Sequence, residues 1–122
     1  MKTPDYDHPI LITPCKGVVS VFFRDTLLAR SDHALVLEEA KYAPVIYIPR
    51  SDIRIEHYVR TEYQTHCPYK GDAHYFSLDI HGLRIPNAVW SYEQPYRAVA
   101  QLRNHVAFYP DRVTFVSELP QG

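Results

Sequence analysis

The residues with the densest chemistry in this sequence lie in segment 65–71, which reads Thr-His-Cys-Pro-Tyr-Lys-Gly. His66 offers an acid or a base and Cys67 a nucleophilic thiol, so both are candidate catalytic residues. Neighbouring side chains on an extended chain point to opposite faces, so His66 could activate Cys67 only if the backbone turned between them. Two structural alternatives stay open, namely an inert and buried Cys67 and a His66 that is bonded to a loop carbonyl.

The segment leads into a predicted β-hairpin. Residues 72–80 and 83–92 are rich in β-formers, and a two-residue loop ending in Gly joins them, which suits a primed turn. An unbroken ladder from this turn places Tyr75 opposite Ala88 and puts alternate residues on a core face. Pro86 has no N–H to donate to the ladder, so a bulge at that position would change the register.

The open end of this hairpin is where we expect a ligand to bind. Tyr75, Trp90 and Tyr92 fall on one face there, and Lys70 stands beside them. Arg50 follows a proline at a strand end and is a second basic candidate with bidentate geometry available. The predicted ligand-binding residues are therefore Arg50, Lys70, Tyr75, Trp90 and Tyr92, and the predicted ligand is a small anionic molecule. We predict that Lys70→Ala abolishes binding while leaving the melting temperature nearly unchanged.

The sequence predicts no metal and no cofactor. Its two cysteines, Cys15 and Cys67, lie far apart, unlike the paired cysteines of structural zinc sites. The Lys70-Gly71 pair lacks the glycine-rich context of a phosphate-binding loop.

The bulk composition excludes several function classes. The chain has 122 residues and a formal charge of −1, with 13 basic and 14 acidic residues mixed along it. No basic surface for nucleic acid or an acidic membrane is expected from this balance. No apolar run is long enough for a signal peptide or a membrane span, so we expect a cytoplasmic protein with reduced thiols.

The pattern predicts a single domain over residues 1–122. An extended arm is expected at 1–16, a β-rich core at 17–117 and a tail at 118–122. Strands are predicted at 18–23, 26–29, 34–40, 45–48, 105–109 and 112–116 in addition to the hairpin. One short helix is predicted at 96–104, and a helical turn at 53–58. The fold class is therefore α+β, dominated by antiparallel β with one short helix.

Four motifs together resemble the domain-of-unknown-function family DUF427. They are Tyr-Ile-Pro-Arg-Ser-Asp-Ile around Arg50, Thr-His-Cys-Pro-Tyr-Lys-Gly at 65–71, Val-Trp-Ser-Tyr at 89–92 and Val-Ala-Phe-Tyr-Pro-Asp-Arg-Val at 106–113. The resemblance runs from about residue 18 to residue 116. It implies a small, mainly bacterial domain with a mostly β fold of the tent or sandwich kind, and a nucleotidyltransferase-like label.

Two functions from different classes follow. The first is a pocket for a small anionic ligand around the 66–70 loop, where His66 would supply acid–base chemistry if a reaction occurs. The second is a non-catalytic interaction module whose exposed aromatic residues bind a partner chain or pair two copies as a homodimer. An enclosed pocket at Lys70, Trp90 and Tyr92 favours the first, and a flat apolar patch favours the second.

Overall fold

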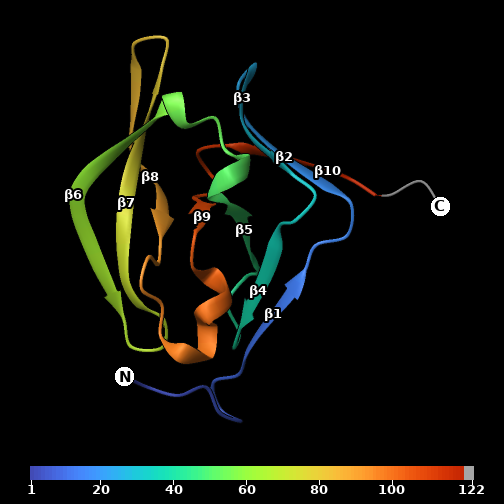
Figure 1. The fold of residues 1–122 in the computed structure, drawn as a ribbon, viewed down its shortest axis with the longest axis vertical. Helices are drawn as coiled ribbons and strands as arrows, with labels where there is room; N and C mark the ends of the chain where they lie inside the picture. Colours follow the sequence, from blue (N-terminus) through green and yellow to red (C-terminus); the bar gives the residue numbers. More distant parts are fainter. Residues whose placement is uncertain (120–122) are drawn as a thin grey trace.

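In the computed structural model, which describes residues 1–119, the chain forms two antiparallel sheets and short 3₁₀ helices. The larger sheet has the strand order β1-β4-β5-β9-β8-β7-β6, and the smaller has the order β10-β2-β3 (Figure 1). The strands of the larger sheet are β1 (Ile10–Pro14), β4 (Leu35–Glu39), β5 (Val45–Pro49), β6 (Tyr58–Cys67), β7 (Gly71–Ile80), β8 (Leu83–Ser91) and β9 (His105–Phe108). Those of the smaller sheet are β2 (Val18–Phe23), β3 (Thr26–Ser31) and β10 (Thr114–Glu118), and the 3₁₀ helices are η1 (Arg50–Asp52), η2 (Ile55–His57) and η3 (Arg97–Leu102). The prediction of a mainly antiparallel β fold is confirmed.

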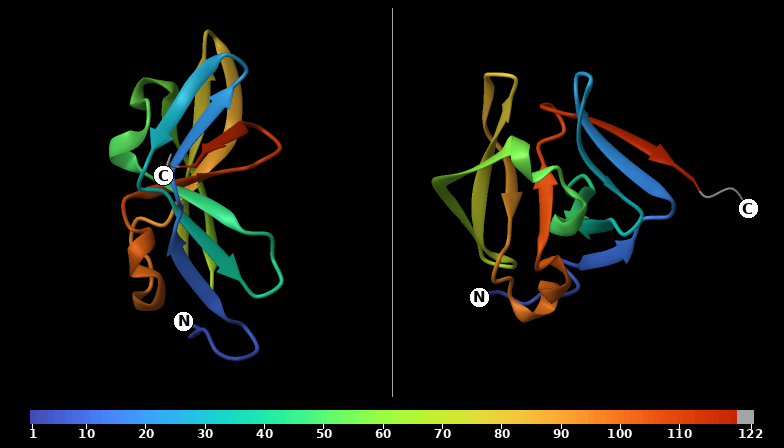
Figure 2. Two further views of the ribbon diagram at one scale, coloured as in Figure 1. Left: turned by 90° about the vertical axis from the view of Figure 1, so that its right-hand side faces the viewer. Right: turned by 45° about the horizontal axis from the view of Figure 1, so that its top comes forward.

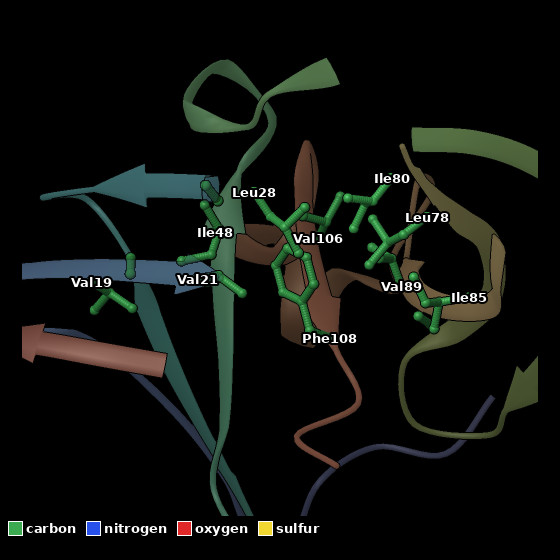
Figure 3. Packing of buried hydrophobic residues seen from close by; sticks show 13 residues of the cluster. Val19, Val21, Leu28, Ile48, Leu78, Ile80, Ile85, Val89, Val106 and Phe108 are labelled. Carbon is green, nitrogen blue, oxygen red and sulfur yellow. The ribbon is translucent and has the colours of Figure 1, made fainter. Parts of the chain in front are cut away.

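The main core lies between the two sheets. Val21 and Leu28 of the smaller sheet are fully buried against Ile48, Leu78 and Val106 of the larger one (Figure 3). These are β-branched or leucine side chains on the inward face of each strand, which is the face that alternation assigns to the core. Burial of this apolar surface is what holds the smaller sheet against the larger.

The opposite face of the larger sheet carries a second buried cluster. Tyr47 and Ala107 belong to it, whereas their chain neighbours Ile48 and Val106 belong to the main core. Leu102 of η3 also packs into this cluster. The larger sheet is thus covered on both faces, and the second face is the one rich in tyrosine.

The β7–β8 hairpin departs from the unbroken ladder expected from the turn. Near the turn, Asp79 lies opposite Arg84 as expected, but beyond a bulge Tyr75 lies opposite Trp90 and not Ala88. The bulge centres on Asn87, whose φ is +47° and whose N–H bonds Ser77 Oγ at 3.0 Å. The predicted pairings above the bulge were therefore wrong by two residues. Because the shift is even, Tyr75, Trp90 and Val89 keep their expected faces, whereas Ala88, expected on the Tyr75 face, packs into the main core.

Other segments differ from the predictions in form. The expected arm at 1–16 contains β1, which pairs with β4 along five residues. The expected helix at 96–104 is the shorter 3₁₀ helix η3, with non-helical dihedral angles at Val99. Strands β9 and β10 belong to different sheets. Of the expected tail at 118–122, residue 118 ends β10 and residues 120–122 lie outside the described part. Within residues 1–119, no helix has the length and apolar character needed to cross a bilayer.

The two ends of the larger sheet differ in what covers them. The β2–β3 and β7–β8 hairpins project side by side at one end (Figure 2). At the other end, the N-terminal arm runs past the β6–β7 turn and η3 (Figure 1), and the N–H of Lys2 donates to the carbonyl of Pro68 at 2.7 Å. The second end is where the 66–70 loop lies.

Candidate functional site

Lys70 is buried at the arm-covered end of the larger sheet. Only 8% of its surface is exposed, and its ammonium is ion-paired with Glu39, which ends β4 and is also 8% exposed. The ammonium also lies 5.8 Å from the ring centroid of Tyr92. Lys70 is therefore not the solvent-exposed amine that the sequence suggested, and in this conformation its charge is already neutralised.

Glu39 holds two partners on one carboxylate. Lys70 bonds Oε1, and the imidazole Nε2 of His8 lies 2.8 Å from Oε2. Burial by itself would raise the pKa of Glu39, but the hydrogen bonds and charges of Lys70 and His8 outweigh it and lower the pKa. The carboxylate is consequently ionised at neutral pH and accepts both hydrogen bonds.

Three buried tyrosines lie on the second face of the sheet, and Tyr92 among them lies beside Lys70. Tyr47, Tyr75 and Tyr92 are each at most 7% exposed, and the Trp90 indole N–H donates to the Tyr47 hydroxyl at 3.3 Å. Burial raises the pKa of Tyr47 and of Tyr92, so both phenols stay protonated at neutral pH. They can donate or accept hydrogen bonds there, but they do not supply a ready base.

His66 and Cys67 are not brought together as a nucleophile and its base. His66 is exposed, and its Nδ1 bonds Asp72 Oδ1 across the β6–β7 ladder at 2.8 Å. Cys67 is half-buried and packs against the second cluster, and the structure places neither cysteine in a disulfide. The two residues are adjacent on β6, so their side chains point to opposite faces of the strand. Catalytic roles for them stay predictions.

Arg50 lies in a different cluster of side chains from Lys70. It begins η1, and its Nη2 bonds Glu93 Oε2 at 2.9 Å. Arg60 of β6 bonds the same carboxylate through both Nη atoms, at 2.6 and 3.0 Å. Both guanidinium groups lie near the Phe76 ring, at 5.3 Å for Arg50 and 5.7 Å for Arg60. A cavity of about 190 Å³ opens between these arginines.

Positive side chains outnumber negative ones at this arginine cavity. Hydrogen bonds from Arg60 lower the pKa of Glu93 to about 2, against a smaller opposing effect of burial and with further help from Arg50. One carboxylate thus faces two guanidinium groups, with the His74 imidazole 3.8 Å from it. Among residues 1–119, the Nε of Arg50 is a buried polar atom without a hydrogen-bond partner.

A larger cavity lies beside Trp90. It measures about 390 Å³ and is lined by Ala43, Pro44, Val45, Ile46, Trp90, Phe108, Pro110 and Phe115. The Tyr109 ring lies 4.7 Å from the Trp90 ring at the same place. Its lining has no charged side chain, so it suits an apolar group and not an anion.

The predicted ligand residues therefore separate into three places. Tyr75 and Tyr92 lie in the second cluster with Lys70 beside the Tyr92 ring, Trp90 joins that cluster to the apolar cavity, and Arg50 lines the arginine cavity. Sequence reasoning missed the partners Glu39, Glu93, Arg60 and His8, because each is far in the chain from the residue that it binds. The position of Glu39 at the end of a strand was the local feature that could have indicated a partner for Lys70.

Comparison with known proteins places the chain in a family. Residues 11–118 match the family described as Domain of unknown function (DUF427). The chain belongs to DUF427. No curated protein matched it.

The motifs that pointed to DUF427 occupy the places just described. Lys70 ends the β6–β7 turn and Gly71 begins β7, and the segment at 89–92 supplies Trp90 and Tyr92. The family description states no activity, so a nucleotidyltransferase-like role has no support beyond a label. Residues 1–119 of the DUF427 chain contain no group of three or more His, Cys, Asp or Glu side chains placed to hold a metal ion.

Proposed function

We propose that this DUF427 domain binds a small amphipathic anion in the arginine cavity between Arg50 and Arg60. The observation that carries the proposal is the buried Nε of Arg50, which lacks a partner among residues 1–119 and belongs to a side chain that lines the cavity. A buried donor without a partner is costly, and a small movement of the guanidinium towards an anion in the cavity would satisfy it.

The charge balance of the cavity supports an anion. Arg50 and Arg60 carry two positive charges, and Glu93 supplies one negative charge, which leaves one positive charge when His74 is neutral. A guanidinium has five N–H donors in a planar fork, so Glu93 does not exhaust those of the two arginines. A ligand carboxylate or phosphate could take the remaining donors with charge-assisted hydrogen bonds.

The walls of the cavity limit the rest of the ligand. Ile53, Ile55, Tyr58, Phe76 and Val106 give it apolar sides. The volume of about 190 Å³ corresponds to roughly six waters at about 30 Å³ each, which is too small for most drug-sized ligands. A short-chain or aromatic carboxylate, with its apolar part against Phe76 and its charge at Arg50, fits these limits.

The proposal keeps the anionic ligand predicted from the sequence but moves it away from the 66–70 loop. Lys70 is paired with Glu39 beneath the arm, whereas Arg50 lines an open cavity. Binding at this cavity is proposed, without a reaction.

The test is a titration of the full chain with benzoate, monitored by two-dimensional NMR. We expect saturable shifts in the wild type, and binding at least tenfold weaker in Arg60→Gln, since Glu93 then loses a partner and repels the anion. Arg84→Gln is the matched control, because Arg84 is similarly exposed and pairs with Asp79 at 3.3 Å in the hairpin. Benzamide, a neutral ligand of the same shape, should not bind.

Equal binding by wild type and Arg60→Gln, or no saturation with benzoate, would overturn the proposal. The second predicted function, an interaction module that pairs two copies, stays a prediction with its own readout. Sedimentation equilibrium of the same samples gives the molecular mass in solution and shows independently whether two copies pair.

A further inference from the structure

The N-terminal arm, residues 1–9, places one aromatic ring on the buried ion pair. The His8 imidazole lies parallel to the Tyr69 ring, with centroids 3.8 Å apart and planes 5° apart. Its Nε2 lies 2.8 Å from the Glu39 carboxylate, whose other oxygen is bonded by Lys70. Because Glu39 is ionised, the imidazole donates this hydrogen bond.

Most other side chains of the arm are exposed. Tyr6 is 98% exposed and Met1 is 81% exposed. The hydrogen bonds that tie the arm backbone to the domain run from Lys2 N–H to the Pro68 carbonyl and from Ala40 N–H to the Pro9 carbonyl, both flanking the ring. Within residues 1–119, His8 is thus the arm side chain that anchors the segment at the ion pair.

The surface under His8 has the features of a recognition site. Tyr69 offers a flat aromatic face, and Glu39 offers a carboxylate oxygen 2.8 Å from a ring stacked on that face. Lys70 is ion-paired with the other oxygen of this carboxylate. Buried ion pairs are often no more stabilising than apolar residues of the same volume, so stability alone is a weak explanation for this pair.

We infer that the surface formed by Tyr69, Glu39 and Lys70 is a binding site for a planar N–H-donating heterocycle, which His8 occupies from within the same chain. A ligand of this class would stack on Tyr69 and donate to Glu39, as the imidazole does. This site is separate from the arginine cavity and does not depend on the proposed anion binding.

Competition between the arm and a free ligand sets the expected affinities. A group on a short flexible tether acts at a millimolar effective concentration. Imidazole should therefore bind weakly to the wild type, where His8 competes with it, and more tightly when the His8 ring is removed. His8 lies in a peripheral arm, so its removal leaves both hydrophobic clusters intact.

The test is a titration of full-length His8→Ala with imidazole at pH 8, monitored by two-dimensional NMR. We expect saturable shifts around residues 39 and 69, at concentrations at least tenfold lower than in the wild type. His33→Ala is the matched control, because His33 is also bonded to an acid but its side chain is 79% exposed. Thiazole, a planar ring without an N–H, should not bind to His8→Ala.

A second substitution checks the stacking geometry. Adding Tyr69→Leu to His8→Ala should weaken imidazole binding several-fold, since the aromatic face is lost. Equal affinity in wild type, His33→Ala and His8→Ala, or no saturation in folded His8→Ala, would overturn the inference. If His8→Ala does not fold, titration of the wild-type protein with imidazole tests the inference. Displacement of the arm signals by excess imidazole supports the site, and unchanged arm signals contradict it.

Discussion

The ammonium of Lys70 is ion-paired with the carboxylate of Glu39, 31 positions earlier in the chain and at the far end of β4. Both side chains are nearly sealed from water, beneath an arm and beside the Tyr92 ring. This pairing joins the β6–β7 turn to the β4 end of the same sheet. It also changes the expected behaviour of Lys70 from that of a free anion-binding amine to that of a structural and site-forming residue.

Replacing Lys70 should therefore destabilise the fold. Lys70→Met leaves the buried Glu39 carboxylate without its main partner, and we expect the free energy of unfolding to fall by about 3–5 kcal/mol. This reverses the near-unchanged melting temperature that an exposed lysine would predict. Urea denaturation measures the change, with Lys16→Met at an exposed position as a control that should stay within about 0.5 kcal/mol of the wild type.

A double substitution distinguishes pairing from simple loss of volume. Lys70→Met combined with Glu39→Gln removes both charges, so we expect it to be less destabilising than the sum of the two single substitutions. Additive losses would show that the two residues do not interact in solution.

The Glu93 carboxylate should make stability depend on pH in the acid range. Its pKa in the folded protein is about 2, below the ordinary value of 4.5, because Arg60 and Arg50 bind the charged form. The unfolded state therefore binds a proton first as the pH falls, and the stabilisation, at most about 3 kcal/mol, is present above pH 4.5 and lost towards pH 2. Chemical denaturation from pH 6 to pH 3 should show the advantage of wild type over Glu93→Gln shrinking. A difference in unfolding free energy between wild type and Glu93→Gln that does not change with pH would contradict this role.

Gly71 should be costlier to replace than Gly82 for a steric reason. Its φ is +109°, and an added Cβ would lie 3.3 Å from the backbone oxygen of Gln94. Gly82 makes a matched control, because its φ is +82° but no atom of residues 1–119 would lie within 4 Å of its Cβ. We expect Gly82→Ala to cost about 1–2 kcal/mol of unfolding free energy. Gly71→Ala should cost more, as measured by thermal or urea denaturation. Equal costs would mean that backbone strain alone accounts for both.

Much of the strand pattern was predictable because it depends on local chemistry. Alternating and β-branched residues predicted β2, β4, β5 and β9 with boundaries close to those observed. The Asp79–Arg84 pairing was also predictable, since a tight turn determines which residues face each other beside it. The face carrying Tyr75, Trp90 and Tyr92 followed from the same alternation.

The register of the upper hairpin was not predictable from the turn. Tyr75 meets Trp90 only because β8 takes up two extra residues at the bulge. Asn87 adopts a positive φ there, donates its N–H to Ser77 and accepts a hydrogen bond from Thr61 on β6 at 2.7 Å. Such a bulge depends on a neighbouring strand whose position the hairpin sequence does not contain.

Local residue types were enough to indicate the strands, the tight turns and the kinds of side chain at the functional positions. Which of these side chains meet depends on how distant segments pack, because ion pairs such as Lys70–Glu39 and Arg50–Glu93 join residues 31 and 43 positions apart. Packing of two sheets and an arm buried the lysine, exposed His66 and opened the cavity at Arg50. The free energies that favour these long-range contacts belong to the folded chain as a whole, and no short stretch of sequence encodes them.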